Sequence, residues 1–258
     1  MEYCFLQGIY EMNIQLKDSL KDICLAQNLS HSEIPDFINL DYLTADNQKY
    51  MNMYDWMSRG YDIVETVVGR LRYGNQINQM RRAIMEKLEW ENGISVLYVS
   101  IGTGKDLEFI PSGIDRKSIS IFGADISAGM LKKCRNKYEG KLNISLVQCC
   151  AEDLPFKDNM FDIVFHVGGI NFFNDKQKAV NEMIRTAKNG SKLLIADETN
   201  DLIENQYRKS SFSKKYFKNA SVDLSEIENL VPEKMTEKKT EILWNGKFYC
   251  MTFRKNEV

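Results

Sequence analysis

The sequence predicts an α/β fold built on a doubly wound, mostly parallel sheet. Between residues 76 and 199, short apolar runs alternate with segments of helical spacing, which is typical of such sheets. The first apolar run, Val96 to Val99, leads directly into a turn that contains Gly102 and Gly104. Near the C-terminus, alternating runs flank Asn245-Gly246, a dipeptide that favours a tight hairpin. We therefore expect parallel strands followed by an antiparallel hairpin.

The composition excludes several classes of protein. The chain has 258 residues, of which 43% are hydrophobic, so it can form one large domain or a core with additions. A net charge of −2 gives no general reason to expect nucleic acid as a partner. The six cysteines form no C-x-x-C pair and no cluster with the two histidines, so we expect free thiols, no metal site and a cytoplasmic location. No apolar run reaches the roughly 18 residues of a transmembrane helix.

The first 75 residues are predicted to form a helical extension or lid ahead of a domain spanning 76–258. Apolar residues at three- and four-residue spacing indicate a helix over 9–27. This helix could cover the core, close over an acceptor pocket or contact a second copy in a homodimer. Residues 46–75 concentrate tyrosines and methionines. They could pack against the main domain or wall a pocket for an apolar or sulfonium-bearing molecule.

The elements of the main domain follow from periodicity and turn residues. The predicted strands are 96–99, 118–124, 143–149, 161–167 and 192–197, with a hairpin over 241–254. The predicted helices are 76–90, one that begins after Ser127, and 175–188, which we expect to stop at Asn189-Gly190. Residues 200–236 are more polar and contain two helical stretches.

Asp125 is the residue that first indicates a ligand. It stands at the carboxyl end of the second predicted strand, twenty-one positions after Gly104. In sheets of this kind a ligand lies across the carboxyl ends of the first strands, where a carboxylate can accept hydrogen bonds from both ribose hydroxyls. The turn lacks both the third glycine of G-x-G-x-x-G and the G-K-[ST] ending of a phosphate loop. A ribonucleoside without phosphates therefore fits better than NAD or ATP, unless Asp125 only caps a helix.

Four successive segments resemble the motifs of class I S-adenosylmethionine-dependent methyltransferases. They are VLYVSIGTGKDLEFIP, FGADISAGMLKKC, LVQCCAEDLPFKDNMFDIVFHVGGINFF and AKNGSKLLIADET. The sequence is most similar to the ubiquinone/menaquinone biosynthesis type and to bacterial phosphatidylethanolamine N-methyltransferases, over residues 94–199. The resemblance implies a Rossmann-like, seven-stranded sheet whose last two strands are the hairpin. It also implies S-adenosylmethionine as cofactor and S-adenosylhomocysteine as product.

The resemblance also assigns cofactor-binding positions. Those expected along the methionine part and the ribose are Ser100, Gly102, Gly104 and Asp125. Those expected around the adenine are Ile126, Met130, Cys150, Ala151 and Glu152. Val167 is expected beneath the sulfonium, and Tyr61 is a candidate cover. We therefore expect an enzyme that transfers a methyl group to a small-molecule or lipid-like acceptor.

Some positions depart from the family pattern. Tyr98 stands where the family usually has an acid, Ser100 where it has a glycine, and Cys150 where it has Asp or Asn. The quinone enzymes carry Arg-Asn where this chain has Asn171-Phe172, so a quinone acceptor is not assumed. These departures keep open a non-catalytic S-adenosylmethionine-binding module, and a nicotinamide-dependent oxidoreductase is a weaker alternative.

Methyl transfer needs mainly alignment of the acceptor with the sulfonium methyl group. A base matters only where the acceptor must lose a proton. His166, near the end of the fourth predicted strand, is the candidate for that role, and its alternative role is to pack or to orient neighbours.

Overall fold

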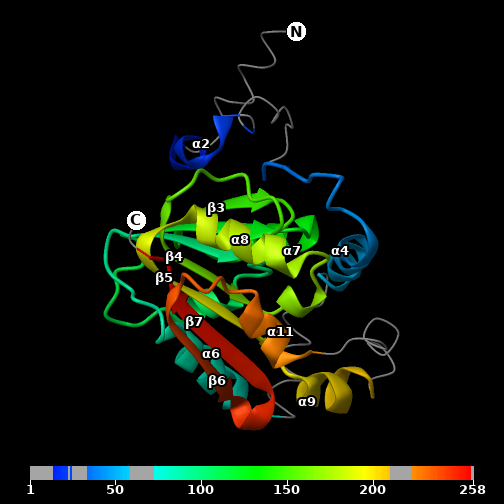
Figure 1. Cartoon of the computed structure of the whole chain (residues 1–258). Helices are drawn as coiled ribbons and strands as arrows, with labels where there is room; N and C mark the ends of the chain where they lie inside the picture. Colours follow the sequence, from blue (N-terminus) through cyan, green and yellow to red (C-terminus); the bar gives the residue numbers. More distant parts are fainter. Residues whose placement is uncertain (1–13, 23, 25–33, 59–72, 210–221, 257–258) are drawn as a thin grey trace.

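A single mixed sheet organises the computed structural model, which describes residues 14–22, 24, 34–58, 73–209 and 222–256 (Figure 1). The described strands lie in the order β3-β2-β1-β4-β5-β7-β6. Their bounds are β1 Ser95–Val99, β2 Ser120–Asp125, β3 Asn143–Gln148, β4 Phe161–Val167, β5 Ala187–Glu198, β6 Thr236–Leu243 and β7 Phe248–Arg254. β1 to β5 pair in parallel, and β7 is antiparallel to both β5 and β6. The predicted fold class and the C-terminal hairpin are confirmed.

Helices and helical turns connect and cover the strands. The α-helices are α2 Ile14–Ser19, α4 Ala45–Met57, α6 Gln76–Met85, α7 Ala128–Tyr138, α8 Lys176–Thr186, α9 Asn200–Leu202 and α11 Leu224–Asn229. Shorter turns are η1 Lys105–Phe109, η2 Ile170–Phe172, η3 Ile203–Tyr207 and η4 Trp244–Gly246. Ser127 caps α7 as expected, because its Oγ accepts a hydrogen bond from the backbone N–H of Met130 at 3.2 Å. Among the described helices, none is long and apolar enough to cross a membrane.

The two faces of the sheet bury separate apolar clusters. Side chains of β1 alternate between them: Val96 and Tyr98 pack with α6 and α7, whereas Leu97 and Val99 pack with α8. The chain runs outward from β1 to β3 and then returns to β4 on the other side of β1. At such a reversal the connections leave in opposite directions, which opens a crevice at the carboxyl ends of the strands.

The structure corrects the end of one predicted helix. α8 ends at Thr186, and Asn189-Gly190 lies within β5 instead of stopping the helix. The cause is tertiary pairing with the segment that follows β7. The N–H of Gly190 donates to the carbonyl of Lys255 at 2.9 Å, and the N–H of Lys255 donates to the carbonyl of Ser191 at 3.0 Å.

One other helix is also shorter than predicted. α6 ends at Met85, whose carbonyl accepts a hydrogen bond from the Trp90 indole at 2.8 Å, so residues 86–90 fold back instead of continuing the helix. Of the helix predicted over 9–27, the described residues contain α2, which ends at Ser19. Residues 9–13, 23 and 25–27 lie outside the described residues, so the full extent of this helix stays a prediction.

The described part of the first 75 residues packs directly on the sheet domain. Leu16 and Leu20 belong to the same buried cluster as β4 and β5. Asp36 forms a parallel bridge to Gln148 at the outer edge of β3, where the N–H of Phe37 donates to the carbonyl of Gln148 at 2.7 Å. The division into two domains at residue 75 stays a prediction.

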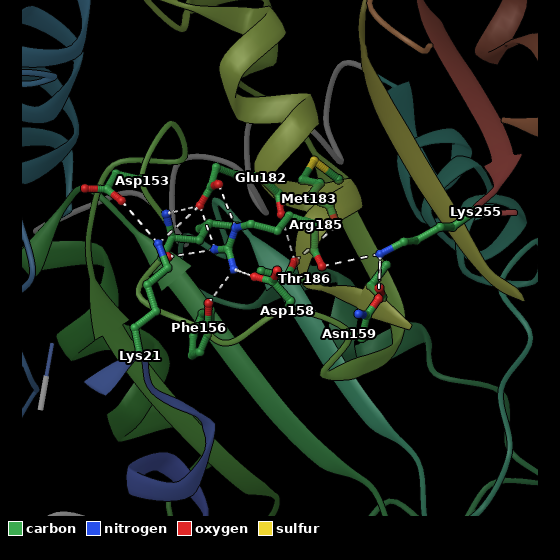
Figure 2. Close-up of polar contacts among 12 residues, drawn as sticks. Lys21, Asp153, Phe156, Asp158, Asn159, Glu182, Met183, Arg185, Thr186 and Lys255 are labelled. Carbon is green, nitrogen blue, oxygen red and sulfur yellow. Dashed lines mark hydrogen bonds and ion pairs between the residues drawn. The ribbon is translucent and has the colours of Figure 1, made fainter. Parts of the chain in front are cut away.

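Arg185 is the centre of a polar network on the α8 side of the sheet (Figure 2). Its guanidinium forms two hydrogen bonds with Glu182, at 2.8 and 2.7 Å, and one with Asp158 at 2.6 Å. It also donates to the carbonyls of Leu154 and Phe156 at 3.1 and 2.8 Å. The Glu182 carboxylate is only 8% exposed, so it needs this charged partner. The network holds the 151–160 loop, which borders the ligand edge, onto α8.

We predict that Arg185→Ala lowers the free energy of unfolding by about 3 kcal/mol, because it removes both guanidinium hydrogen bonds of the buried Glu182 carboxylate and the donors to two carbonyls. Chemical denaturation monitored by circular dichroism measures the change. Arg208→Ala is the matched control, because the pair of Arg208 with Glu204 is exposed and should contribute less than about 0.5 kcal/mol. Equal effects of the two substitutions would contradict the prediction.

Candidate functional site

A cavity of about 350 Å³ lies at the carboxyl ends of the central strands. Its floor comes from the segments that follow β1, β2, β4 and β5, and α4 contributes to its walls. The volume is in the range of small-molecule sites, and the position is the crevice expected at the reversal of strand order.

The Asp125 carboxylate joins the two loops that form this floor. One oxygen accepts a hydrogen bond from the N–H of Gly102 at 2.8 Å, and the other accepts from the N–H of Ser127 at 2.9 Å. Loss of hydration raises the pKa of Asp125 from its usual value to about 6, while these two backbone donors oppose the rise and the nearby charge of Asp55 adds to it. Each oxygen has a second lone pair, so the carboxylate can still accept hydrogen bonds from a ligand.

The turn after β1 has the backbone conformation that its residues suggested. Ser100, Gly102 and Gly104 have φ values of 58°, 55° and 72°, a region that glycine adopts easily and serine rarely. Ser100 and Gly102 line the cavity, but Gly104 does not. A Cβ at Gly104 would lie 2.7 Å from Cε2 of Tyr138, so this glycine allows close packing of α7 on the turn.

Most of the predicted cofactor positions meet at the cavity. Those that line it are Ser100, Gly102, Asp125, Ile126, Met130, Ala151, Glu152 and Val167. Cys150 is buried and does not line it; its neighbour Cys149 does. Glu152 is held in place because its carboxylate accepts a hydrogen bond from the Asn47 amide at 2.9 Å. Tyr61 lies outside the described residues.

α4 covers one side of the cavity and is fastened to α7. Tyr50 and Tyr54 line the cavity, whereas Met53 is buried in a small cluster. The Asp55 carboxylate accepts from the hydroxyl of Ser127 at 2.5 Å and from the N–H of Gly129 at 3.0 Å. The aromatic stretch predicted from the sequence therefore both packs and walls a pocket, within its described part.

His166 orients the backbone beneath the cavity. Its side chain is 0% exposed and does not line the cavity. Nδ1 lies 3.1 Å from the carbonyl of Val99, to which it donates, and Nε2 accepts from the N–H of Ile170 at 2.9 Å. Burial lowers its pKa to about 4, so the ring is neutral at pH 7. With both nitrogens engaged, the geometry favours the orienting role over that of a proton acceptor.

Sequence reasoning missed a polar cluster beside the first turn. The Tyr98 hydroxyl donates to Oδ2 of Asp106 at 2.6 Å, and Nη1 of Arg81 donates to the same oxygen at 2.6 Å. All three residues line the cavity, and Asp106 is only 1% exposed. The available signal was the acid two positions after Gly104.

Glu198, also missed from the sequence, lines the other end of the cavity. It is the last residue of β5, a strand that lies three strand spacings, or roughly 14 Å, from β2. The preceding Asp197 is 0% exposed and accepts from the N–H groups of Gly169 and Asn171 at 3.0 and 2.9 Å. Burial, together with the charge of Glu198, raises the pKa of Asp197 well above its usual value.

Comparison with models of known protein families identifies the family of this chain. The model of the ubiE/COQ5 methyltransferase family matches residues 43–227, which is more than half of the chain. The chain belongs to the ubiE/COQ5 methyltransferase family. The match begins just before α4 and ends in α11, so it includes both the cavity floor and the covering helix.

Curated relatives carry names from the same family. The chain is 34% identical over 173 residues to the ubiquinone/menaquinone biosynthesis C-methyltransferase UbiE of Shewanella piezotolerans, with 64% of this chain and 66% of that protein covered. It is 32% identical over 146 residues to the demethylmenaquinone methyltransferase of Renibacterium salmoninarum, with 56% of each chain covered. The chain thus spans between about half and two thirds of the length of these relatives.

Solved structures show that the fold is shared more widely. Phosphoethanolamine N-methyltransferase 2 of Haemonchus contortus, in complex with S-adenosyl-L-methionine, matches with a TM-score of 0.61 at 18% identity, covering 84% of this chain and 60% of that one. The [4+2]-cyclase SpnF matches with a TM-score of 0.64 at 14% identity, covering 82% and 96%. At these identities the likeness shows the fold alone.

We predict that His166 makes folding less favourable as the pH falls from about 6.5 to about 4. In this window the unfolded chain binds a proton at His166, but the folded protein does not, so stability is lost on acidification, by about 3 kcal/mol in the limit. In His166→Gln this part of the loss should be absent. Urea denaturation of both proteins at a series of pH values measures the difference. Parallel pH curves would contradict the prediction.

Proposed function

We propose that the protein is an S-adenosylmethionine-dependent methyltransferase that acts on a small-molecule or lipid-like acceptor. The observation that carries this proposal is the Asp125 carboxylate, held by the Gly102 and Ser127 N–H groups at the floor of the cavity, in a chain of this family. A nucleoside with two ribose hydroxyls satisfies the acceptor capacity that remains on Asp125.

The surrounding residues suit the rest of the cofactor. Ile126 and Met130 supply apolar surface on one side of Asp125, where an adenine ring would lie. Val167 and the Gly168-Gly169 turn lie at the end of β4, where the sulfonium would be presented to the acceptor. The bound cofactor would supply an activated methyl group, so the protein's task is to hold the acceptor in line with it.

The acceptor is proposed to contact the aromatic wall at the β5 end of the cavity. Tyr73 and Trp244 form an edge-to-face pair with ring centroids 4.9 Å apart, and Phe172 and Phe248 also line the cavity. Flat rings and apolar chains both pack well on such a wall. Reduced demethylmenaquinone is the first acceptor to test, because a similar protein is named as a demethylmenaquinone methyltransferase.

Glu198 is the residue that we propose to take a proton from the acceptor. Transfer would form a bond between the acceptor and the methyl group, break the methyl–sulfur bond and release S-adenosylhomocysteine. The acceptor would then have to give up a proton if its attacking atom carries one. His166 has both nitrogens occupied, whereas the Glu198 carboxylate lines the cavity at the acceptor end. Asp197 and Asn171 hold the backbone of Glu198 through hydrogen bonds of 2.8 and 2.9 Å.

We predict that Asp125→Asn raises the Kd of S-adenosylhomocysteine about 100-fold, because the amide has one acceptor oxygen in place of two charged ones. Isothermal titration calorimetry measures this Kd. Asp115→Asn is the control, because Asp115 is exposed and does not line the cavity.

The wild-type affinity should also fall by up to about tenfold per pH unit below pH 6, where Asp125 binds a proton, and Asp125→Asn should lack this dependence. Wild-type protein that gives no heat at millimolar ligand would refute the proposal.

We predict that Glu198→Gln lowers kcat about 100-fold with reduced demethylmenaquinone as acceptor, while the Kd of S-adenosylhomocysteine stays unchanged. Transfer of a radiolabelled methyl group from S-adenosylmethionine measures the rate. Unchanged kcat would exclude Glu198 as the proton acceptor, and saturable cofactor binding without turnover of any tested acceptor would favour a non-catalytic module.

A further inference from the structure

Asp106 is a buried carboxylate whose acceptor capacity is only half used. Its Oδ2 receives the Tyr98 hydroxyl and Arg81 Nη1, both at 2.6 Å. Among the described residues, no hydrogen-bond donor reaches its Oδ1, although the side chain is 1% exposed. A buried, charged oxygen without a donor is costly, and folded proteins usually provide a partner for it. A ligand is one source of such a partner.

The position of Asp106 suggests which part of a ligand it would meet. Asp106 lies in η1, directly after the turn that contains Ser100 and Gly102, and it lines the same cavity as Asp125. The same turn contacts Asp125, because the N–H of Gly102 donates to the Asp125 carboxylate. A molecule whose ribose is bound by Asp125 and whose other end follows the turn toward β1 would therefore bring that other end to Asp106.

Tyr98 and Arg81 hold the carboxylate in one orientation. Tyr98 is itself immobilised, because it is 2% exposed and stacks on Phe165 with ring centroids 4.2 Å apart. Arg81 is on α6 and its side chain is 15% exposed. Both donors converge on Oδ2, which leaves Oδ1 for a third donor. A cationic N–H donor fits best, since charge-assisted hydrogen bonds are the strongest available to a carboxylate.

We propose that Asp106 binds the ammonium group of the amino-acid end of S-adenosylmethionine, with Tyr98 and Arg81 as positioning residues. This inference rests on the proposed function, because it takes the cofactor for granted. The proposal also accounts for Tyr98 in β1, which stands where the family usually has an acid. The tyrosine carries no charge of its own but orients a carboxylate that comes from the following turn.

If Asp106 had a purely structural role, its replacement would change the ligand affinities in a different way. The Arg81–Asp106 ion pair joins α6 to η1, so its loss would loosen the cavity wall as a whole. Binding of every ligand would then weaken together. A specific ammonium site instead predicts loss of affinity only for ligands that carry the ammonium group.

Three ligands separate these roles in calorimetric titrations of the full chain. S-Adenosylhomocysteine carries the whole amino acid, its decarboxylated form keeps only the ammonium, and 5′-methylthioadenosine has neither group. We expect Asp106→Asn to raise the Kd of the first two by about 10- to 100-fold and to leave the Kd of methylthioadenosine unchanged. Tyr98→Phe should produce the same selectivity with a smaller loss, about 3- to 10-fold, because the carboxylate keeps its charge but loses one support.

Glu108→Gln is the matched control. Glu108 belongs to the same η1 turn, but it pairs with Lys105 and Lys137 and does not line the cavity. It should leave all three Kd values unchanged. Equal weakening of all three ligands in Asp106→Asn and Tyr98→Phe, or no weakening, would overturn the inference while the proposed function stands. Wild-type protein that binds none of the ligands would overturn the proposed function and this inference with it.

Discussion

The Asp125 carboxylate is the constraint on which the ligand edge depends. It accepts one backbone N–H from the turn after β1 and one from the turn after β2, so the two loops keep a common geometry. Ser127 extends the connection, because its hydroxyl donates to Asp55 and thereby fastens α4 over the cavity. Removing this carboxylate from water is unfavourable and raises its pKa, and the backbone donors offset only part of that cost. A ligand that donates to it would offset more.

In the cluster around Asp106, a tyrosine on β1 and a carboxylate on η1 stand in place of an acidic residue on β1 itself. The interior of β1 is buried on both faces, so an isolated carboxylate there would need full compensation. Tyr98 avoids that cost because its ring stacks on Phe165 and its one polar group, the hydroxyl, donates a hydrogen bond to Asp106. The charge is placed instead on η1, where Arg81 from α6 can reach it. The departure from the family pattern at Tyr98 thus has a local physical explanation.

His166 and Glu198 illustrate why residue type alone does not identify a proton acceptor. A histidine near a strand end matched the chemistry, but the neighbouring strand and the η2 turn use both of its nitrogens. Glu198 lies two positions past the last residue of β5 that pairs with β4, although it still pairs with Phe248 of β7, and it lines the cavity. Burial lowers the pKa of His166, which keeps the ring neutral and suited to orienting backbone.

The sequence by itself determined the sheet, the hairpin and the place of Asp125 at the cavity, because strand periodicity, Asn-Gly turns and the spacing from glycine to acid are local signals. It also indicated most of the cavity lining through the family motifs. Tertiary structure decided the rest. Pairing with Lys255 drew Asn189-Gly190 into β5, and close packing against Tyr138 turned Gly104 away from the ligand. The Tyr98, Arg81 and Asp106 cluster comes from three separate elements, so the acid after the glycine turn did not by itself reveal its partners.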